Sequence, residues 1–169
     1  MFRNLMPLLA RNFHVLAPDL MYVFDYGAPI GFRLAMRQPE RVLGIVSQNG
    51  NIYQEGLGPK WAERAKYWAN PTPELRAQYE SAFAPETIKG QYLTGEKPGT
   101  VGPDGYSLDI AHTTESGYAQ RQDDLIFDYQ TNVALYPQFQ DHVRQYQPEI
   151  LAAWGKNDPS FIYPGAPRS

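Results

Sequence analysis

Short apolar runs that alternate with a helical segment constrain the first third of this sequence more than any other feature. Residues 21–24 form one such run, and residues 42–47 form another that ends in a polar turn. Between them, Pro29 suits the first turn of a helix over residues 30–37, and Pro39 ends it. Strand, helix and strand at this spacing are typical of a βαβ unit, so the sequence predicts an α/β fold with a parallel sheet.

An additional apolar run, residues 13–17, lies too close to the run at 21–24 for an ordinary parallel pair. Only three residues separate the two runs, whereas parallel neighbours need a crossover of about a dozen residues. Either the two runs form one bent or antiparallel pair, or a crossover that the chain once encoded has been lost. Before them, residues 1–10 carry apolar side chains at helical spacing and no cleavage site, which predicts an amphipathic helix rather than a signal peptide.

The middle of the chain, residues 54–147, changes to short helical segments rich in tyrosine and tryptophan. Apolar spacing and proline positions predict helices over residues 61–69, 73–83, 85–93, 123–135 and 137–146, and a turn-rich segment over 98–105. A buried strand is predicted at residues 149–154 and a loop from Ser160 onwards. We therefore expect a first core part at 1–53, a helical insert at 54–147 and a second, incomplete core part at 148–169.

Composition excludes several classes of function. The formal net charge is −3 and the basic residues are scattered among acidic ones, so no basic face can follow a phosphate backbone and we expect no nucleic-acid partner. The chain has no cysteine, which excludes disulfides, a thiolate nucleophile and zinc–thiolate sites. Its apolar stretches are far shorter than the roughly 18 residues of a membrane span, so we expect a cytoplasmic protein without a membrane partner.

Asp25 is the first candidate for chemistry. It ends an apolar strand, is followed by Gly27 and Ala28, and opens a helix. A sharp strand-to-helix turn needs small residues and lifts one side chain clear of the sheet, which is the geometry of a nucleophile elbow. A carboxylate there could attack an alkyl carbon and form an ester, with the positive end of the helix stabilising the anion. The alternative is an aspartate that only caps the helix.

Four segments, residues 2–9, 15–20, 23–31 and 153–159, carry a resemblance to a known family. They resemble the haloalkane dehalogenase and epoxide hydrolase branch of the α/β hydrolases, over nearly the whole chain. The resemblance is strongest around Asp25, where that branch has an aspartate nucleophile instead of the serine of Gly-x-Ser-x-Gly. It implies an α/β-hydrolase fold with a helical cap at 54–147. The implied reaction is hydrolysis of carbon–halogen or epoxide bonds through an alkyl-ester intermediate.

The resemblance also implies further site residues and a substrate class. Asp158 is similar to the acid that orients the catalytic histidine, although an aspartate in Asn-Asp-Pro is equally typical of a turn. Some relatives place this acid after the preceding strand, where this chain has Asn49 and Asn51. Tyr26 occupies the position at which dehalogenases of this branch have a halide-binding tryptophan. The change from tryptophan to tyrosine argues against an alkyl halide as the substrate. The implied substrate is small and apolar, with no cofactor and no metal ion.

Departures from the family pattern concern the second half of the reaction. The family's His-Gly motif is missing, and so are the loop and helix expected between Leu20 and Met21. None of the three histidines, His14, His112 and His142, follows Asp158, which is where the family has its catalytic base. His14 is expected to be packed in a strand, and the other two to face solvent. Asp25 could therefore form an ester, but we expect this chain not to hydrolyse it.

Two further interpretations remain open. In epoxide hydrolases, tyrosines of the cap protonate the oxygen of the opening epoxide ring. Packing is the default interpretation for each tyrosine of the insert here. The tyrosines that could take the protonating role are Tyr67, Tyr92, Tyr118, Tyr129 and Tyr136. The chain could also be a non-catalytic remnant of a truncated gene product that at most binds apolar ligands. A conventional esterase is excluded, because no Gly-x-Ser-x-Gly occurs.

Overall fold

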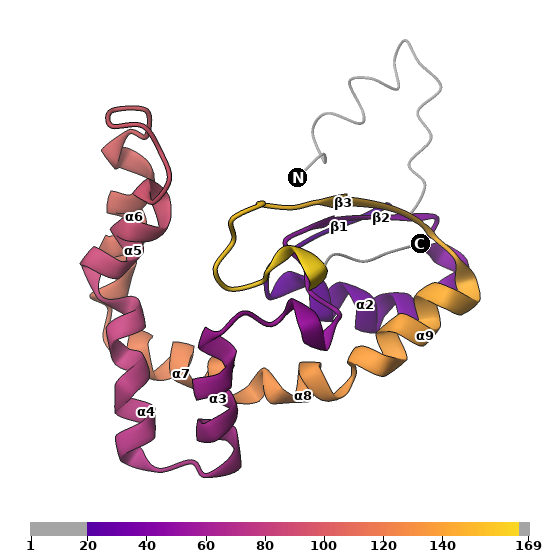
Figure 1. Cartoon of the computed structure of the whole chain (residues 1–169), viewed down its shortest axis with the longest axis horizontal. Coiled ribbons are helices and arrows are strands. Elements are labelled where there is room, and N and C mark those ends of the chain that lie inside the picture. Colours follow the sequence, from indigo (N-terminus) through magenta and orange to yellow (C-terminus); the bar gives the residue numbers. More distant parts are fainter. Residues whose placement is uncertain (1–19, 166–169) are drawn as a thin grey trace. The chain divides into compact units, whose positions relative to one another are not determined.

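The computed structural model of the chain describes residues 20–165, which divide into two units (Figure 1). The sheet unit comprises the described residues up to Gly58 and again from Leu135, and the helical unit comprises residues 59–134. The predicted helix at 1–10 and strand at 13–17 lie outside the described residues.

Three parallel strands form the sheet. They are β1 (Leu20–Phe24), β2 (Gly44–Gln48) and β3 (Glu149–Ala153), in the order β1-β2-β3. The register aligns Val23 with Ser47 and Ser47 with Ala152. Mixed helices and a parallel sheet agree with the predicted α/β class.

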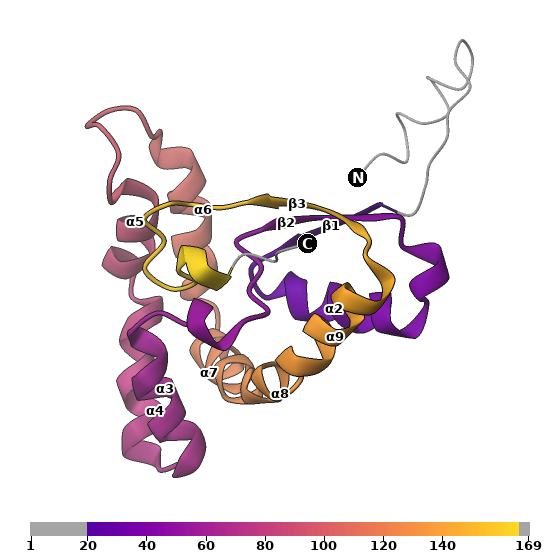
Figure 2. The same ribbon diagram turned by 45° about the vertical axis from the view of Figure 1, so that its right-hand side comes forward.

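Helix α2 (Gly27–Arg37) and the short 3-10 helix η1 (Pro39–Arg41) make the crossover between β1 and β2. Helix α9 (Tyr136–Tyr146) leads into β3, and both helices lie on the same face of the sheet (Figures 1 and 2). The ring centroids of Phe32 in α2 and Phe139 in α9 are 5.6 Å apart, and both side chains are buried. Gly31 allows α2 to approach β1, since a Cβ there would lie 2.3 Å from Cγ1 of Val23.

The segments that follow β2 and β3 are joined to each other. After β2 comes the 3-10 helix η2 (Gln54–Gly56), and the chain reaches η4 (Tyr163–Gly165) after β3. Leu57 and Phe161 form an isolated antiparallel bridge, the amide of Gly58 donates to the carbonyl of Ser160 at 2.9 Å, and the amide of Ile162 donates to the carbonyl of Gly56 at 2.9 Å. The chain leaves the sheet unit immediately after this bridge.

The helical unit contains α3 (Lys60–Ala69), α4 (Pro73–Glu80), η3 (Ser81–Phe83), α5 (Pro85–Leu93), α6 (Pro103–Thr113), α7 (Tyr118–Asp128) and α8 (Gln130–Ala134). Aromatic rings fill its interior: the centroids of Trp61 and Tyr129 are 4.7 Å apart, and those of Tyr67 and Phe127 are 5.3 Å apart. Two tyrosines of the insert, Tyr67 and Tyr129, are therefore buried in the packing of this unit. Within residues 20–165 no helix is long and apolar enough to cross a membrane.

The structure departs from the expected elements at two places in this unit. The segment predicted to be turn-rich contains the start of α6, because Pro103 occupies the first helical turn and Asp104 supplies an acidic side chain there. The helix predicted over 123–135 is divided into α7 and α8 at Tyr129.

Candidate functional site

Asp25 lies in the tight turn between β1 and α2. Its φ of 46° is in the left-handed region, which a residue with a Cβ adopts only at an energetic cost. The amide of Asp25 donates to the carbonyl of Gln48 at 3.3 Å, which extends the pairing with β2 by one residue. Its carbonyl accepts from the amide of Ala28 at 3.0 Å and so closes the turn into the helix. The predicted strand-to-helix turn at Asp25 is therefore present.

Small residues surround this turn because another segment passes close to it. Ala28 is buried in the first turn of α2, and a Cβ on Gly50 would lie only 2.5 Å from the Cβ of Ala28. Gly27 has open space on its side. The first turn of α2 thus lies beside Asp25, and the positive end of the helix dipole favours a carboxylate or a leaving anion there.

Asn49 occupies the equivalent position after β2. Its φ is 47°, also in the left-handed region, and its amide donates to the carbonyl of Ala153 at 3.0 Å. The side-chain oxygen accepts from the amide of Gly155 at 3.2 Å, and Nδ2 donates to Oδ2 of Asp158. One asparagine therefore connects the end of β2 with the loop that follows β3.

Asp158 is held by three donors. Its Oδ1 accepts from the amides of Ser160 at 2.8 Å and Phe161 at 3.0 Å, and its Oδ2 accepts from Asn49. An ionised carboxylate has about four acceptor sites, so this arrangement leaves about one site on Oδ2. Asp158 is thus a turn aspartate by its local bonds, and the same bonds fix its orientation.

Asp25, Asn49 and Asp158 belong to one edge of the sheet. Each follows the carboxyl end of a strand, and β1 and β3 both flank β2, so the ends of β1 and β3 lie about 10 Å apart. Open parallel sheets bind ligands outside this edge. Among residues 20–165, Asp25, Asn49 and Gln147 are the residues other than glycine with a positive φ, so two of three such positions fall at this edge. Backbone strain of this kind gathers at functional sites.

The other residues considered after β1 and β2 have different surroundings. Tyr26 is half-buried and directly precedes α2, next to Asp25. Asn51 is fully buried, donates from Nδ2 to the hydroxyl of Tyr136 at 3.2 Å, and accepts from the amide of Tyr53 at 3.1 Å. Of the two asparagines considered as alternative positions for the acid, Asn49 therefore contacts Asp158 and Asn51 anchors the loop.

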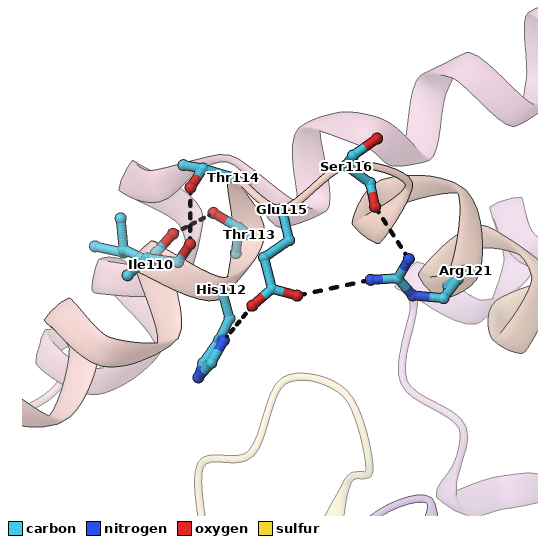
Figure 3. Close-up of polar contacts among 8 residues, drawn as sticks. Ile110, His112, Thr113, Thr114, Glu115, Ser116 and Arg121 are labelled. Atoms are coloured by element: carbon cyan, nitrogen blue, oxygen red, sulfur yellow. Dashed lines mark hydrogen bonds and ion pairs between the residues drawn. The ribbon is translucent and has the colours of Figure 1, made fainter.

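The structure describes two of the three histidines. His112 is exposed, as expected, and its Nδ1 lies 2.7 Å from Oε1 of Glu115, which also faces Arg121 (Figure 3). The prediction that His142 faces solvent was wrong, because the ring is buried in α9 with its centroid 4.8 Å from that of Tyr146. Burial lowers the pKa of His142, since it disfavours the charged imidazolium. His14 lies outside the described residues.

The insert tyrosines are engaged in packing or in local hydrogen bonds. Tyr67, Tyr129 and Tyr136 are buried, and Tyr118 contacts Phe83 edge-on at 6.1 Å. Tyr92 donates to Asp109, and this hydrogen bond raises the pKa of the phenol. Within the described part of the chain, no group of three or more acidic or histidine side chains could hold a metal ion.

The sequence identifies a relative although no protein-family profile matches it. The chain is 37% identical over 207 residues to a protein of Saccharomyces cerevisiae named uncharacterized hydrolase YNR064C, with 98% of this chain and 71% of the yeast protein covered. Because the 207 aligned positions exceed the 169 residues of this chain, the yeast protein has residues that this chain lacks. At this identity and coverage, the chain belongs to the same hydrolase family as the yeast protein.

Proposed function

We propose that Asp25 is the nucleophile of a hydrolase that cleaves carbon–halogen or epoxide carbon–oxygen bonds. The observation that carries this proposal is the left-handed backbone of Asp25 at the turn between β1 and α2. An aspartate that only capped the helix would need no positive φ, because cap residues adopt the extended region without strain. The hydrolase relationship supports bond cleavage as the class of reaction.

The first half of the proposed reaction is a displacement. A carboxylate oxygen of Asp25 attacks the substrate carbon, a carbon–oxygen ester bond forms, and the carbon–halogen bond breaks with its electron pair leaving on the halide. With an epoxide, the ring carbon–oxygen bond breaks instead and the oxygen must receive a proton. Tyr26, next to Asp25, is our candidate hydrogen-bond donor to the leaving group. The start of α2 supports the developing negative charge.

The second half requires a base that activates water against the ester. Asp158, fixed by Asn49 and two backbone amides, has about one acceptor site with which to orient an imidazole. His112 is bonded to Glu115, and His142 lies against Tyr146. We therefore propose that a polypeptide of these 169 residues stops at the ester of Asp25.

The test is a search for that ester. The 169-residue chain is incubated with a primary alkyl bromide or with a terminal epoxide, and the intact mass and the peptide that contains Asp25 are measured by mass spectrometry. We expect at most one equivalent of adduct, located on Asp25, together with at most one equivalent of released bromide. Hydroxylamine should remove the adduct, because it cleaves esters.

Two matched variants separate the roles of the acids. Asp25→Asn should form no adduct, whereas Asp158→Asn should form it at an unchanged yield, since the displacement does not use Asp158. Adduct on other carboxylates at equal yield, or none on Asp25 with either reagent, would overturn the nucleophile assignment. Sustained bromide release above one equivalent that requires Asp25 would overturn the proposed arrest. Reversible binding of the reagent without adduct would favour an apolar-ligand binder.

A further inference from the structure

Asn49 and Gly50 form a dipeptide that is prone to a spontaneous chemical change. The chain has seven asparagines, and Asn49 is the one that a glycine follows. An asparagine deamidates when the backbone nitrogen of the next residue attacks its Cγ, and glycine hinders this attack least because it has no side chain. Asn49 is half-buried, so water can reach it. Among residues 20–165, no group accepts a hydrogen bond from the amide of Gly50, which leaves the attacking nitrogen unengaged.

Hydrogen bonds restrain both partners of this reaction in the folded chain. The side chain of Asn49 is held at its two ends, because its oxygen accepts from the amide of Gly155 at 3.2 Å and its Nδ2 donates to Oδ2 of Asp158. The carbonyl of Gly50 accepts from Oγ of Ser47 at 3.2 Å. Ring closure turns the side chain of Asn49 onto the nitrogen of Gly50 and removes Nδ2, so it cannot proceed while the side-chain bonds are kept.

Close packing around Gly50 adds a second restraint. Gly50 is buried, and a Cβ there would lie 2.5 Å from Cβ of Ala28 and 2.6 Å from Oγ of Ser47. Its backbone is therefore packed between the first turn of α2 and the end of β2. Closing the ring requires the peptide between Asn49 and Gly50 to rotate, and tight packing opposes this rotation. The reaction is thus tied to a local opening of the turn after β2.

We propose that Asn49 is a modification site that the folded chain keeps closed, and that its deamidation permanently cuts the link between β2 and the loop after β3. In the first step the nitrogen of Gly50 loses its proton to base and forms a bond to Cγ of Asn49. The bond from Cγ to Nδ2 breaks, and Nδ2 takes up a proton and leaves as ammonia. In the second step water opens the resulting succinimide ring. Opening at Cγ gives aspartate, and opening at the backbone carbonyl gives isoaspartate.

Either product of this reaction loses its hold on Asp158. Nδ2 of Asn49 is a donor, whereas the carboxylate that replaces the amide only accepts hydrogen bonds and carries the same charge as Asp158. The two carboxylates repel each other, while Asp158 retains the amides of Ser160 and Phe161. Isoaspartate also lengthens the backbone, which alters the turn after β2. This modification is independent of any reaction at Asp25.

The experiment follows the conversion in the full 169-residue chain at mildly alkaline pH. Peptide mapping detects the mass shift from amide to acid, and a methyltransferase specific for isoaspartate detects the second product. We expect the chain denatured in guanidinium chloride to convert Asn49 at least about tenfold faster than the folded chain, because denaturation breaks a hydrogen bond to a charged group. Asp158→Ala should accelerate the conversion in the folded chain by about tenfold for the same reason. Ile30→Gly, an exposed position of α2, is the control for global destabilisation and should leave the rate nearly unchanged, because the opening is local.

Two aspartate variants test the consequence of the modification. Asn49→Asp reproduces one product and should lower the urea midpoint. Asn157→Asp adds the same charge at an exposed position of the loop after β3 and should leave the midpoint nearly unchanged.

Several results would contradict the proposal. No conversion of Asn49 in the denatured chain would show that it is not a modification site. An equal rate in the folded and denatured chains, a comparison that needs no variant, would show that the fold does not keep the site closed. Equal acceleration by Asp158→Ala and Ile30→Gly would have the same meaning. An Asn49→Asp chain with an unchanged urea midpoint would refute the loss of the link.

Discussion

The left-handed backbone at Asp25 leads to a prediction about the free energy of unfolding. At position 25 a glycine variant should be more stable than an alanine variant, whereas at position 30 the alanine variant should be the more stable one. At position 25 an alanine has to adopt a φ of 46°, which costs a residue with a Cβ about 1–2 kcal/mol. A glycine avoids that cost but loses about 0.5–1 kcal/mol more conformational entropy on folding. Asp25→Gly should therefore have a free energy of unfolding about 0.5–1 kcal/mol higher than that of Asp25→Ala. Both variants lose the carboxylate, so its own interactions cancel in the comparison.

Ile30 supplies the control within the same helix. Its side chain is 62% exposed in α2, where the backbone is right-handed. The free energy of unfolding of Ile30→Ala should therefore be about 0.8–1 kcal/mol higher than that of Ile30→Gly. The four variants are unfolded in urea and followed by far-UV circular dichroism, with equal m-values as the check that the same transition is compared. If Asp25→Ala proved as stable as Asp25→Gly or more so, Asp25 would not be held in the left-handed region in solution. The argument for an elbow would then lose its basis.

Three more predictions concern other parts of the molecule. Phe32→Ala should lower the free energy of unfolding by about 3–5 kcal/mol, measured by urea titration, because it empties the contact between α2 and α9, whereas Leu34→Ala on the exposed side of α2 should cost under about 1 kcal/mol. His112→Ala should raise the pKa of Glu115 towards its ordinary value in a carboxyl NMR titration, because the hydrogen bond from His112 lowers that pKa. Any stability that this pair contributes is present above the ordinary pKa of Glu115 and is lost as the pH falls through its lowered pKa in the folded chain. Leu151→Ser removes an exposed apolar side chain of β3, so it should reduce the fluorescence of a bound hydrophobic dye and the light scattering of the chain without lowering the urea midpoint; an unchanged dye signal would show that the exposed apolar side chains of the sheet do not bind the dye.

Local patterns predicted the elements well where sequence neighbours decide them. Pro85 predicted the start of the helix that ends at Leu93, and the apolar runs located all three described strands to within about two residues. The helix from Pro103 was missed because Pro-Asp-Gly is equally compatible with a turn and with a first helical turn. Only the packing of α6 on α5 decides between the two.

The candidate site also has one feature that local sequence predicts and others that depend on the tertiary fold. The turn at Asp25 follows from a strand end and adjacent small residues, which are local features. The contact between Asn49 and Asp158 joins residues that are 109 positions apart. It depends on the order of the strands in the sheet, so local sequence patterns could not predict it. Its signal was an asparagine directly after a strand, since this residue type tolerates a positive φ. The burial of His142 escaped prediction because a single histidine on a helix carries no sign of the face that packs.

The bridge between Leu57 and Phe161 has a mechanical consequence. The chain enters the helical unit directly after Gly58, and the amide of Gly58 is bonded to Ser160, whose own amide is bonded to Asp158. Two hydrogen bonds thus connect Gly58, the last residue of the sheet unit before the helical unit, with the carboxylate of Asp158, so a substitution that displaces the backbone at Gly58 should also disturb the orientation of Asp158.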